Sequence, residues 1–144
     1  MAGKGDTFEN DVMKLIFQAT AIANVADNAA SAPLTNLYVS LHTADPTDSG
    51  NQTSSEAAYT SYARVAVART AGGWTVSGNA VTNAAEIAFP ACTGSSSTIT
   101  HFAIGTASSG TGKILYVGTV SPNLAVSTGI TPRFAAGELD GTED

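Results

Sequence analysis

The chain has 144 residues, a length that fits one domain with one core better than two full domains. Its formal charge is −6, and its six Lys and Arg residues are scattered, so we expect no nucleic-acid partner because phosphate binding needs clustered basic residues. No apolar stretch is long enough to span a bilayer, and we therefore expect no membrane partner.

The N-terminal segment predicts an amphipathic helix at residues 6–27. Asp6 and Glu9 have the spacing of a capping box, and apolar residues then recur at steps of three and four. This apolar stripe is wide, and it either covers the protein's own sheet or meets a neighbouring subunit. The members that we predict as candidate interface residues are Phe8, Ile16, Phe17 and Ile22.

From residue 35 onward the apolar pattern changes to a period of two, which is typical of β-strands. Leu37, Val39 and Leu41 alternate with other side chains, and short strands separated by Gly- and Ser-containing turns continue to residue 137. The segment 113–120 is apolar on both faces, which predicts a central strand.

The element order predicts the fold class. Parallel βαβ architecture is excluded because no second helical pattern follows the first. We predict a mainly β protein, one domain over residues 1–144, with an antiparallel β-sandwich or jelly-roll-like barrel of about eight or nine strands at residues 35–137. One N-terminal amphipathic helix precedes the strands, and an acidic, peripheral tail at residues 138–144 follows them.

A polar, turn-rich segment at residues 45–58 predicts a long surface loop. Tyr59 and Tyr62 follow it directly. Tyrosine suits half-wet interfaces, so we predict both residues as further candidates for contact with another subunit.

Residues that could carry chemistry are few. His42, Asp45 and His101 are the one plausible metal or acid–base trio, but a zinc site needs three or four converging ligands and nothing local indicates convergence. Trp74 could be an exposed sugar-stacking ring, although its position on a short strand favours the core, and the lone Cys92 is interpreted as a core filler. We therefore expect no catalytic site, no metal and no cofactor.

Six segments occur in an order that resembles a family of small virion proteins of tailed bacteriophages. They cover most of residues 35–137 and are NLYVSLHTADP (36–46), YARVAV (62–67), IAFP (87–90), THFAIG (100–105), LYVG (115–118) and PRFAAG (132–137). Members of that family are described as tail-fibre, head-fibre or capsid decoration proteins, and the resemblance implies no catalytic residues.

The resemblance implies a structural protein of the virion, assembled in the host cytoplasm. We expect a capsid decoration or cement protein that binds across major capsid protein subunits, since the sequence contains no coiled-coil or Gly-x-y shaft of a fibre. The alternative is a tail fibre, tail tip or baseplate component that takes part in receptor binding or tail assembly. In either role we expect a homo-oligomer, a trimer or a dimer, that contacts the major capsid protein or other virion proteins. An enzyme unrelated to phages is the third and least favoured hypothesis.

Overall fold

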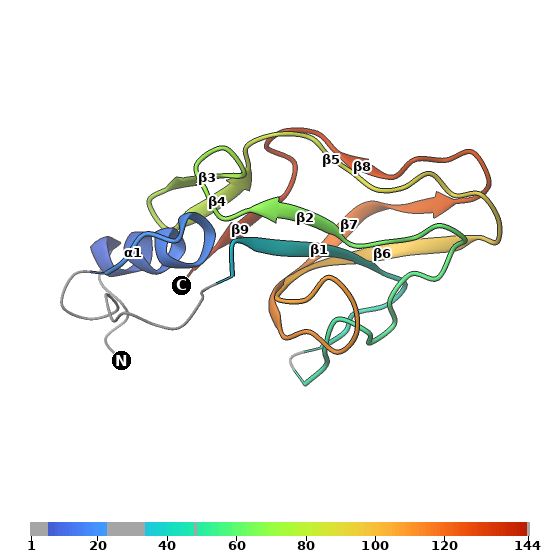
Figure 1. The fold of residues 1–144 in the computed structure, drawn as a ribbon, viewed down its shortest axis with the longest axis horizontal. Coiled ribbons are helices and arrows are strands. Elements are labelled where there is room, and N and C mark those ends of the chain that lie inside the picture. The colour runs from blue at the N-terminus through green and yellow to red at the C-terminus, as the bar shows by residue number, and fades with distance from the viewer. Residues whose placement is uncertain (1–5, 23–33, 48, 144) are drawn as a thin grey trace. The chain divides into compact units, whose positions relative to one another are not determined.

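The computed structural model describes residues 6–22, 34–47 and 49–143. These residues form one α-helix and nine β-strands (Figure 1). The elements are α1 (Asp6–Gln18), β1 (Asn36–His42), β2 (Val65–Ala68), β3 (Trp74–Ser77), β4 (Ala80–Asn83), β5 (Ile87–Ala88), β6 (Ser97–Gly105), β7 (Ile114–Val126), β8 (Arg133–Phe134) and β9 (Asp140–Thr142).

The strands form three sheets within the described residues. Their orders are β2-β1-β6-β7, β3-β4-β9 and β5-β8. Pairing is antiparallel between β1 and β6, β6 and β7, β3 and β4, and β4 and β9. The prediction of a mainly β protein with antiparallel sheets and one helix near the N-terminus is confirmed. Of the two architectures expected, the barrel is not found, because the sheets of the described residues do not close on themselves.

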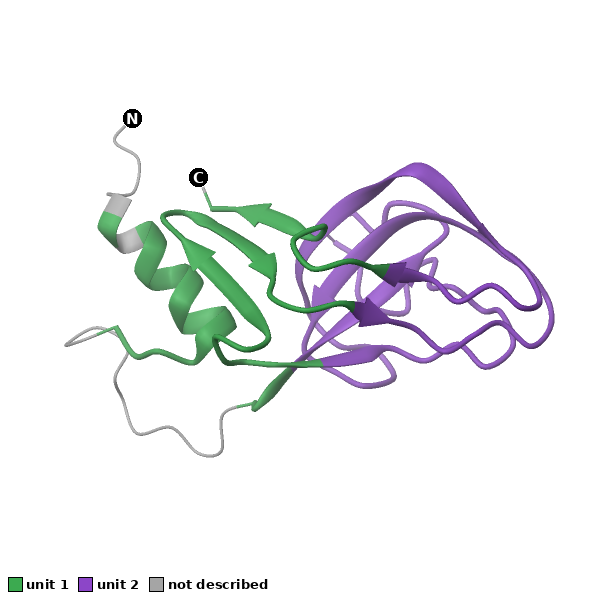
Figure 2. Ribbon diagram, turned by 90° about the horizontal axis from the view of Figure 1, so that it is seen from above, with its two compact units in different colours: residues 1–36, 67–86, 134–144 green, residues 37–66, 87–133 purple. Residues whose placement is uncertain are grey.

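The chain divides into two compact units (Figure 2). Unit 1 comprises residues 1–36, 67–86 and 134–144, and unit 2 comprises residues 37–66 and 87–133. The chain passes between the units several times, so neither unit is a continuous segment. The expectation of a single domain stays a prediction.

Unit 1 builds its core between α1 and the sheet β3-β4-β9. Phe17 of α1 meets Trp74 of β3 edge to face, with ring centroids 4.8 Å apart and an interplanar angle of 63°. Met13, Val81 and Leu139 are buried in the same unit, none of them more than 2% exposed. Trp74 is only 1% exposed, so its predicted place in the core is confirmed.

The helix is shorter than predicted. It begins at Asp6 but ends at Gln18 instead of residue 27, and residues 23–27 lie outside the described residues. Ala19 takes a left-handed φ of 52°, which breaks the helical path, and the Thr20 amide donates to the Lys14 carbonyl at 3.1 Å. The helical spacing of apolar residues therefore continues in the sequence beyond Gln18, although the backbone conformation of Ala19 ends the helix there.

The C-terminal segment is acidic as expected, but its described residues, 138–143, are not peripheral. Leu139 is 1% exposed, and β9 pairs with β4 as the edge strand of the unit 1 sheet. The side chain of Asn83 joins this segment to the core. Its Oδ1 accepts from the Leu139 amide at 2.9 Å, and its Nδ2 donates to the Ala85 and Ala135 carbonyls, both at 2.8 Å.

Unit 2 is organised around β1, which pairs with β6 and is buried on both faces. Side chains alternate along a strand, so Val39 and Leu41 lie on one face and Ser40 and His42 on the other. All four are at most 1% exposed. The ring of His42 has a partner in the loop that follows β1, the Ser54 carbonyl, whereas the Ser40 hydroxyl lies within hydrogen-bond distance of His42 and of the Ala103 carbonyl of β6.

β7 is an edge strand, which corrects the central position predicted for residues 113–120. It pairs with β6 on one side and has no further strand on the other among the described residues. Its side chains are half-buried or exposed over most of its 13 residues. The run of apolar residues on both faces was misleading because half-buried positions of an edge strand can be apolar too.

Candidate functional site

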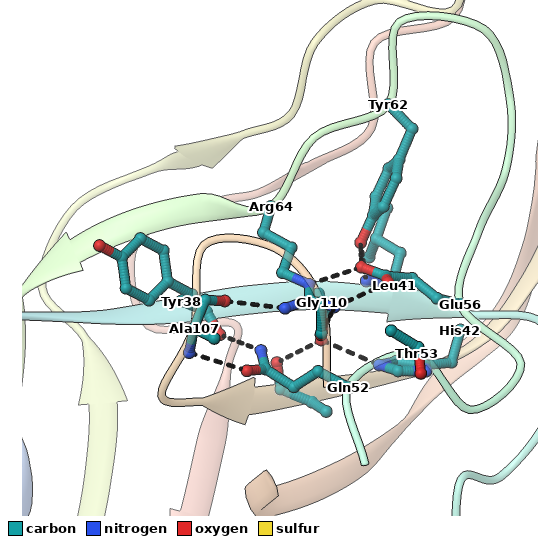
Figure 3. Close-up of polar contacts among 12 residues, drawn as sticks. Tyr38, Leu41, His42, Gln52, Thr53, Glu56, Tyr62, Arg64, Ala107 and Gly110 are labelled. Carbon is teal, nitrogen blue, oxygen red and sulfur yellow. Dashed lines mark hydrogen bonds and ion pairs between the residues drawn. The ribbon is translucent and has the colours of Figure 1, made fainter. Parts of the chain in front are cut away.

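Two loops of unit 2, residues 43–64 and 106–113, are connected to each other by side-chain hydrogen bonds, and we call them the loop platform. Figure 3 shows the polar side chains that connect these loops to β1. The structure describes every platform residue except 48. The contacts within the platform show which parts are fixed and which side chains remain available to a partner.

An ion pair between Glu56 and Arg64 lies at the centre of the platform. Arg64 Nε and Nη2 donate to the two carboxylate oxygens of Glu56 at 2.7 and 2.8 Å, a bidentate arrangement. The same guanidinium donates to the carbonyls of Ala107 at 2.9 Å and Gly110 at 2.8 Å, so it ties the second loop to the first. The hydrogen bonds to Glu56 raise the pKa of Arg64 above its ordinary value. Arg64 therefore stays charged and acts as a structural crosslink.

Tyr62 completes this network. Its hydroxyl donates to Glu56 Oε1 at 2.9 Å and accepts from the Leu41 amide of β1 at 3.0 Å. Burial raises the pKa of the phenol above its ordinary value, so it remains protonated and can donate. The ring lies nearly parallel to that of Phe89, with centroids 6.3 Å apart, and edge-on to Tyr59 at 5.3 Å. Tyr62 thus links the platform to the aromatic core of unit 2.

Gln52 fixes the second loop from inside. The side chain is fully buried, and its Oε1 accepts from the Ala107 amide at 3.0 Å while its Nε2 donates to the Tyr38 carbonyl at 3.3 Å. A Cβ at either Gly105 or Gly112 would collide with the amide group of Gln52. The two glycines are needed because only their missing side chains leave room for this amide.

His42 lies beneath the same loop. Its Nδ1 is 2.8 Å from the Ser54 carbonyl, and its Nε2 is 2.9 Å from the Ser40 hydroxyl. A carbonyl can only accept, so the neutral ring carries its proton on Nδ1 and accepts from Ser40 at Nε2. Burial lowers the pKa of His42, which keeps the ring neutral.

Of the trio considered as a metal or acid–base site, the structure brings two members together, because His42 and His101 lie directly opposite each other in the register of β1 and β6. The Asp45 carboxylate accepts from the Thr47 amide at 2.8 Å at the surface, while the ring of His42 is enclosed. His101 Nδ1 is 2.8 Å from the hydroxyl of Thr100. In the part of the chain that the structure describes, no three His, Cys, Asp or Glu side chains gather so that they could hold a metal ion.

The candidate interface residues of the N-terminal segment are largely enclosed in unit 1. Phe17 is fully buried, Ile22 is 9% exposed and Ile16 is half-buried. The side chain of Phe8 lies outside the described residues. The apolar stripe thus covers the sheet of its own unit, and contact with another subunit stays a prediction.

The two candidate tyrosines differ in exposure. Tyr59 is 2% exposed, and its hydroxyl donates to the Pro90 carbonyl at 3.0 Å. Tyr62 is half-buried and belongs to the platform network. Their role in an interface is untested, whereas their role in holding unit 2 together is direct.

Sequence reasoning did not find Gln52, Glu56 and Arg64. Glu56 and Arg64 carry a weak signal, since they are opposite charges eight residues apart on either side of Tyr59 and Tyr62. Gln52 carries none, because its burial depends on Gly105 and Gly112 far along the chain. Cys92, in contrast, was interpreted correctly, for its thiol is buried and donates to the Gly94 carbonyl at 3.2 Å.

Two hollows open beside the platform. One has a volume of about 260 Å³ and is lined by Glu56, Tyr62, Ala63, Arg64, Ser108, Ser109 and Gly110. The other is a groove of about 610 Å³ along the start of β7, lined by Thr47, Gly50, Lys113, Ile114, Leu115, Tyr116 and Val117. Both lie in unit 2 and both are open to solvent, so a partner can reach them without any opening of the fold.

Residues 5–142 match the family model described as Podophage GP4 fiber I protein gp80. The chain belongs to this family. The resemblance to small virion proteins of tailed phages is thereby confirmed, and the chain is a structural protein of a phage virion, from a family of fibre proteins. None of the curated proteins compared with the chain matches it. No helix among the described residues is long and apolar enough to cross a bilayer.

Proposed function

We propose that the chain is a non-enzymatic structural subunit of a podophage fibre, and that the loop platform is its contact surface for a neighbouring virion protein. The observation that carries the proposal is the family match over residues 5–142, which includes segments of both compact units. A fibre subunit must hold a fixed shape while it binds its neighbours. The hydrogen bonds that fix the two platform loops are consistent with such a fixed shape.

The platform loops are preorganised. Arg64 and Gln52 bind both loops through part-buried hydrogen bonds, so little conformational entropy remains to be lost when a partner binds. The outward side chains are mostly small hydroxyls, and among the exposed ones are Thr43, Thr47, Ser49, Thr53, Ser55, Ser108 and Ser109. A rigid, hydroxyl-coated surface suits a polar contact between proteins that are soluble before assembly.

Capsid decoration, the first expectation from the sequence, is the second candidate. The sequence contains neither a heptad repeat nor a Gly-x-y shaft, and this favours a compact decorating module. A protein that binds only the assembled shell would stabilise it by about 4 kcal/mol per site at a thousand times its dissociation constant. The two candidates therefore predict different defects.

Phage particles that lack this chain distinguish the two candidates. For a fibre subunit we expect heads that withstand heating as well as wild-type heads, together with particles that adsorb poorly to the host. Heads that release DNA at lower temperature while adsorption stays normal would favour decoration and contradict the fibre proposal.

Substitutions on the platform test its role in assembly. Ala58→Arg and Ser109→Arg place a bulky charge on exposed platform positions without touching the buried network. We expect both folded variants to be missing from purified particles when they complement a deletion. Thr128→Arg, at an exposed turn elsewhere in unit 2, is the matched control and should be incorporated. Normal incorporation of all three variants would exclude the platform as the contact surface.

A further inference from the structure

The hydrogen bonds around the ring of His42 match its neutral form. The side chain is fully buried, its Nδ1 donates to the Ser54 carbonyl at 2.8 Å, and its Nε2 accepts from the Ser40 hydroxyl at 2.9 Å. A second ring proton would lie on Nε2 and face that hydroxyl. The Ser40 proton would then have to turn to the Ala103 carbonyl at 3.4 Å, a long hydrogen bond.

The charged and titratable groups around the ring do not compensate a positive charge on it. The loop after β1 brings Glu56 and Arg64, which are paired with each other, and β6 brings His101 directly opposite in the register. The sequence of β2, the other neighbour of β1, contains no titratable residue. Burial is the main cause that lowers the pKa of His42. The Ser54 hydrogen bond and Glu56 raise this pKa, whereas Arg64 and His101 lower it further.

The segment at residues 54–57 is the part of this environment that can move away. It pairs with the end of β1 through two backbone hydrogen bonds, from the Thr43 amide to the Ser55 carbonyl and from the Ala57 amide to the Leu41 carbonyl, both 2.8 Å long. Ser55 has a left-handed φ of 53°, which is strained for a residue with a side chain. β1 itself is held on both sides by β2 and β6. A charged ring therefore reaches water most easily when the segment detaches.

We propose that His42 is a pH-sensitive switch that controls the attachment of segment 54–57 to the end of β1. The segment stays paired while the ring is neutral, and it detaches when the ring takes up a proton in mild acid. Glu56 belongs to the segment and leaves with it, so Arg64 loses the carboxylate that fixes it beside the second platform loop. The switch is a property of the isolated chain and holds whichever virion protein the platform contacts.

Native-state hydrogen exchange of the full chain measures the switch through the amide protons of Thr43 and Ala57. In the detached form His42 has its ordinary pKa of 6.5, so protonation at pH 5.5 favours this form by a factor of about eleven. After correction for intrinsic exchange rates, the protection factors of both amides should fall several-fold, at most about tenfold, between pH 7.5 and 5.5. Protection factors that stay the same would overturn the proposal.

Low concentrations of urea separate detachment of the segment from unfolding of the whole chain. A local opening exposes little surface, so its exchange is nearly independent of urea, whereas exchange through complete unfolding accelerates with urea. We expect the Thr43 and Ala57 amides to exchange faster in acid without responding to urea. A urea response as steep as that of the slowest amides of β1 and β6 would contradict the switch.

Two substitutions identify the group that takes up the proton. The sequence contains two histidines, His42 and His101, and histidine is the side chain that ordinarily titrates in this pH range. His42→Asn keeps an N–H donor near the position of Nδ1 but cannot be protonated, so its Thr43 and Ala57 amides should have the same protection factors at both pH values.

His101→Asn is the matched control and should keep the wild-type response to pH. Circular dichroism at pH 7.5 checks that both variants are folded. A response that persists in His42→Asn, or that disappears in His101→Asn, would overturn the assignment of the switch to His42. Should His42→Asn fail to fold, the wild-type exchange data and the His101→Asn control decide the question.

Discussion

Arg69 hydrogen-bonds the main chain of Ile16, a residue 53 positions earlier in the sequence. Its Nε donates to the Ile16 carbonyl at 2.6 Å, and its Nη2 and Nη1 donate to the carbonyls of Leu15 and Leu34, also at 2.6 Å. The last turn of α1 contains no basic residue of its own. Arg69 therefore supplies both the hydrogen bonds and the positive charge that the C-terminal end of a helix needs.

Replacement of Arg69 should loosen the end of α1. Arg69→Met leaves the carbonyls of Leu15 and Ile16 without their donors, and we expect the free energy of unfolding to fall by about 2–3 kcal/mol, the scale of hydrogen bonds to a charged group. Arg69→Lys keeps the charge but loses the planar fork, so it should recover only part of the loss. Urea denaturation of the two variants measures this order, and a lysine variant as stable as the wild type would contradict the role of the fork.

Asn83 should be as important to unit 1 as a large apolar residue. Asn83→Leu leaves the Leu139 amide and the Ala85 and Ala135 carbonyls without partners, which should lower stability by about 3 kcal/mol. Asn123→Leu is a control at an exposed position of β7 and should change stability little. Thermal melting compares them, and a melting temperature of Asn83→Leu equal to that of the control would exclude the hydrogen-bonding role.

Local signals predicted the elements well where one segment alone determines its structure. The start of α1 follows from the spacing of Asp6 and Glu9, and the alternation of Leu37, Val39 and Leu41 predicted β1 correctly. The end of the helix could not be predicted in this way. The side chain that caps it belongs to Arg69, which lies in another part of the chain, so the sequence of the helix alone does not reveal this contact.

The candidate site shows the same division. Tyr62 was singled out as an amphipathic residue beside a polar loop, and the structure places it in the platform network. Gln52 was missed because a polar residue in a polar loop is expected to be exposed. Its burial depends on Gly105 and Gly112, which approach it only after the sheet has formed. The position of β7 at the edge of its sheet could not be predicted either, since apolar residues on both faces do not distinguish an edge strand from a central one.

Unit 2 should lose stability in mild acid because of His42. Burial is the main cause that lowers the pKa of His42 in the folded chain. The hydrogen bond to the Ser54 carbonyl and the charge of Glu56 raise this pKa, and Arg64 and His101 lower it further. In the unfolded chain, His42 has its ordinary pKa of 6.5 and binds a proton as the pH falls below that value. The folded chain, with its lower pKa, does not yet bind this proton. The stabilising effect is fully present above that pH and is lost as the pH falls below it toward the folded pKa.

The measurement is the free energy of unfolding by urea between pH 7.5 and about 5, above the range where ordinary carboxylates titrate. Wild-type stability should decrease across the lower part of this interval. His42→Asn removes the titrating ring, so this variant should be less stable at pH 7.5 but flatter with pH. Equal slopes for the two proteins would show that another group causes the acid sensitivity.

The Glu56–Arg64 pair should show strong energetic coupling. Arg64 is 2% exposed in its side chain and Glu56 17%, so removal of either partner leaves a poorly solvated charge. We expect Glu56→Gln and Arg64→Met each to lower the free energy of unfolding by about 3 kcal/mol. The double variant should lose much less than the sum of the two losses. Additive losses in this double-mutant cycle would indicate that the two side chains act independently.

The position of the chain on the virion is the most direct test of its function as a fibre subunit. A peptide tag inserted in the exposed turn at residues 127–129 of unit 2 can be labelled with antibody and gold on intact particles and located by electron microscopy. We predict gold on the fibres that project from the particle. Gold spread evenly over the head shell, or particles without the tagged chain, would contradict the proposal.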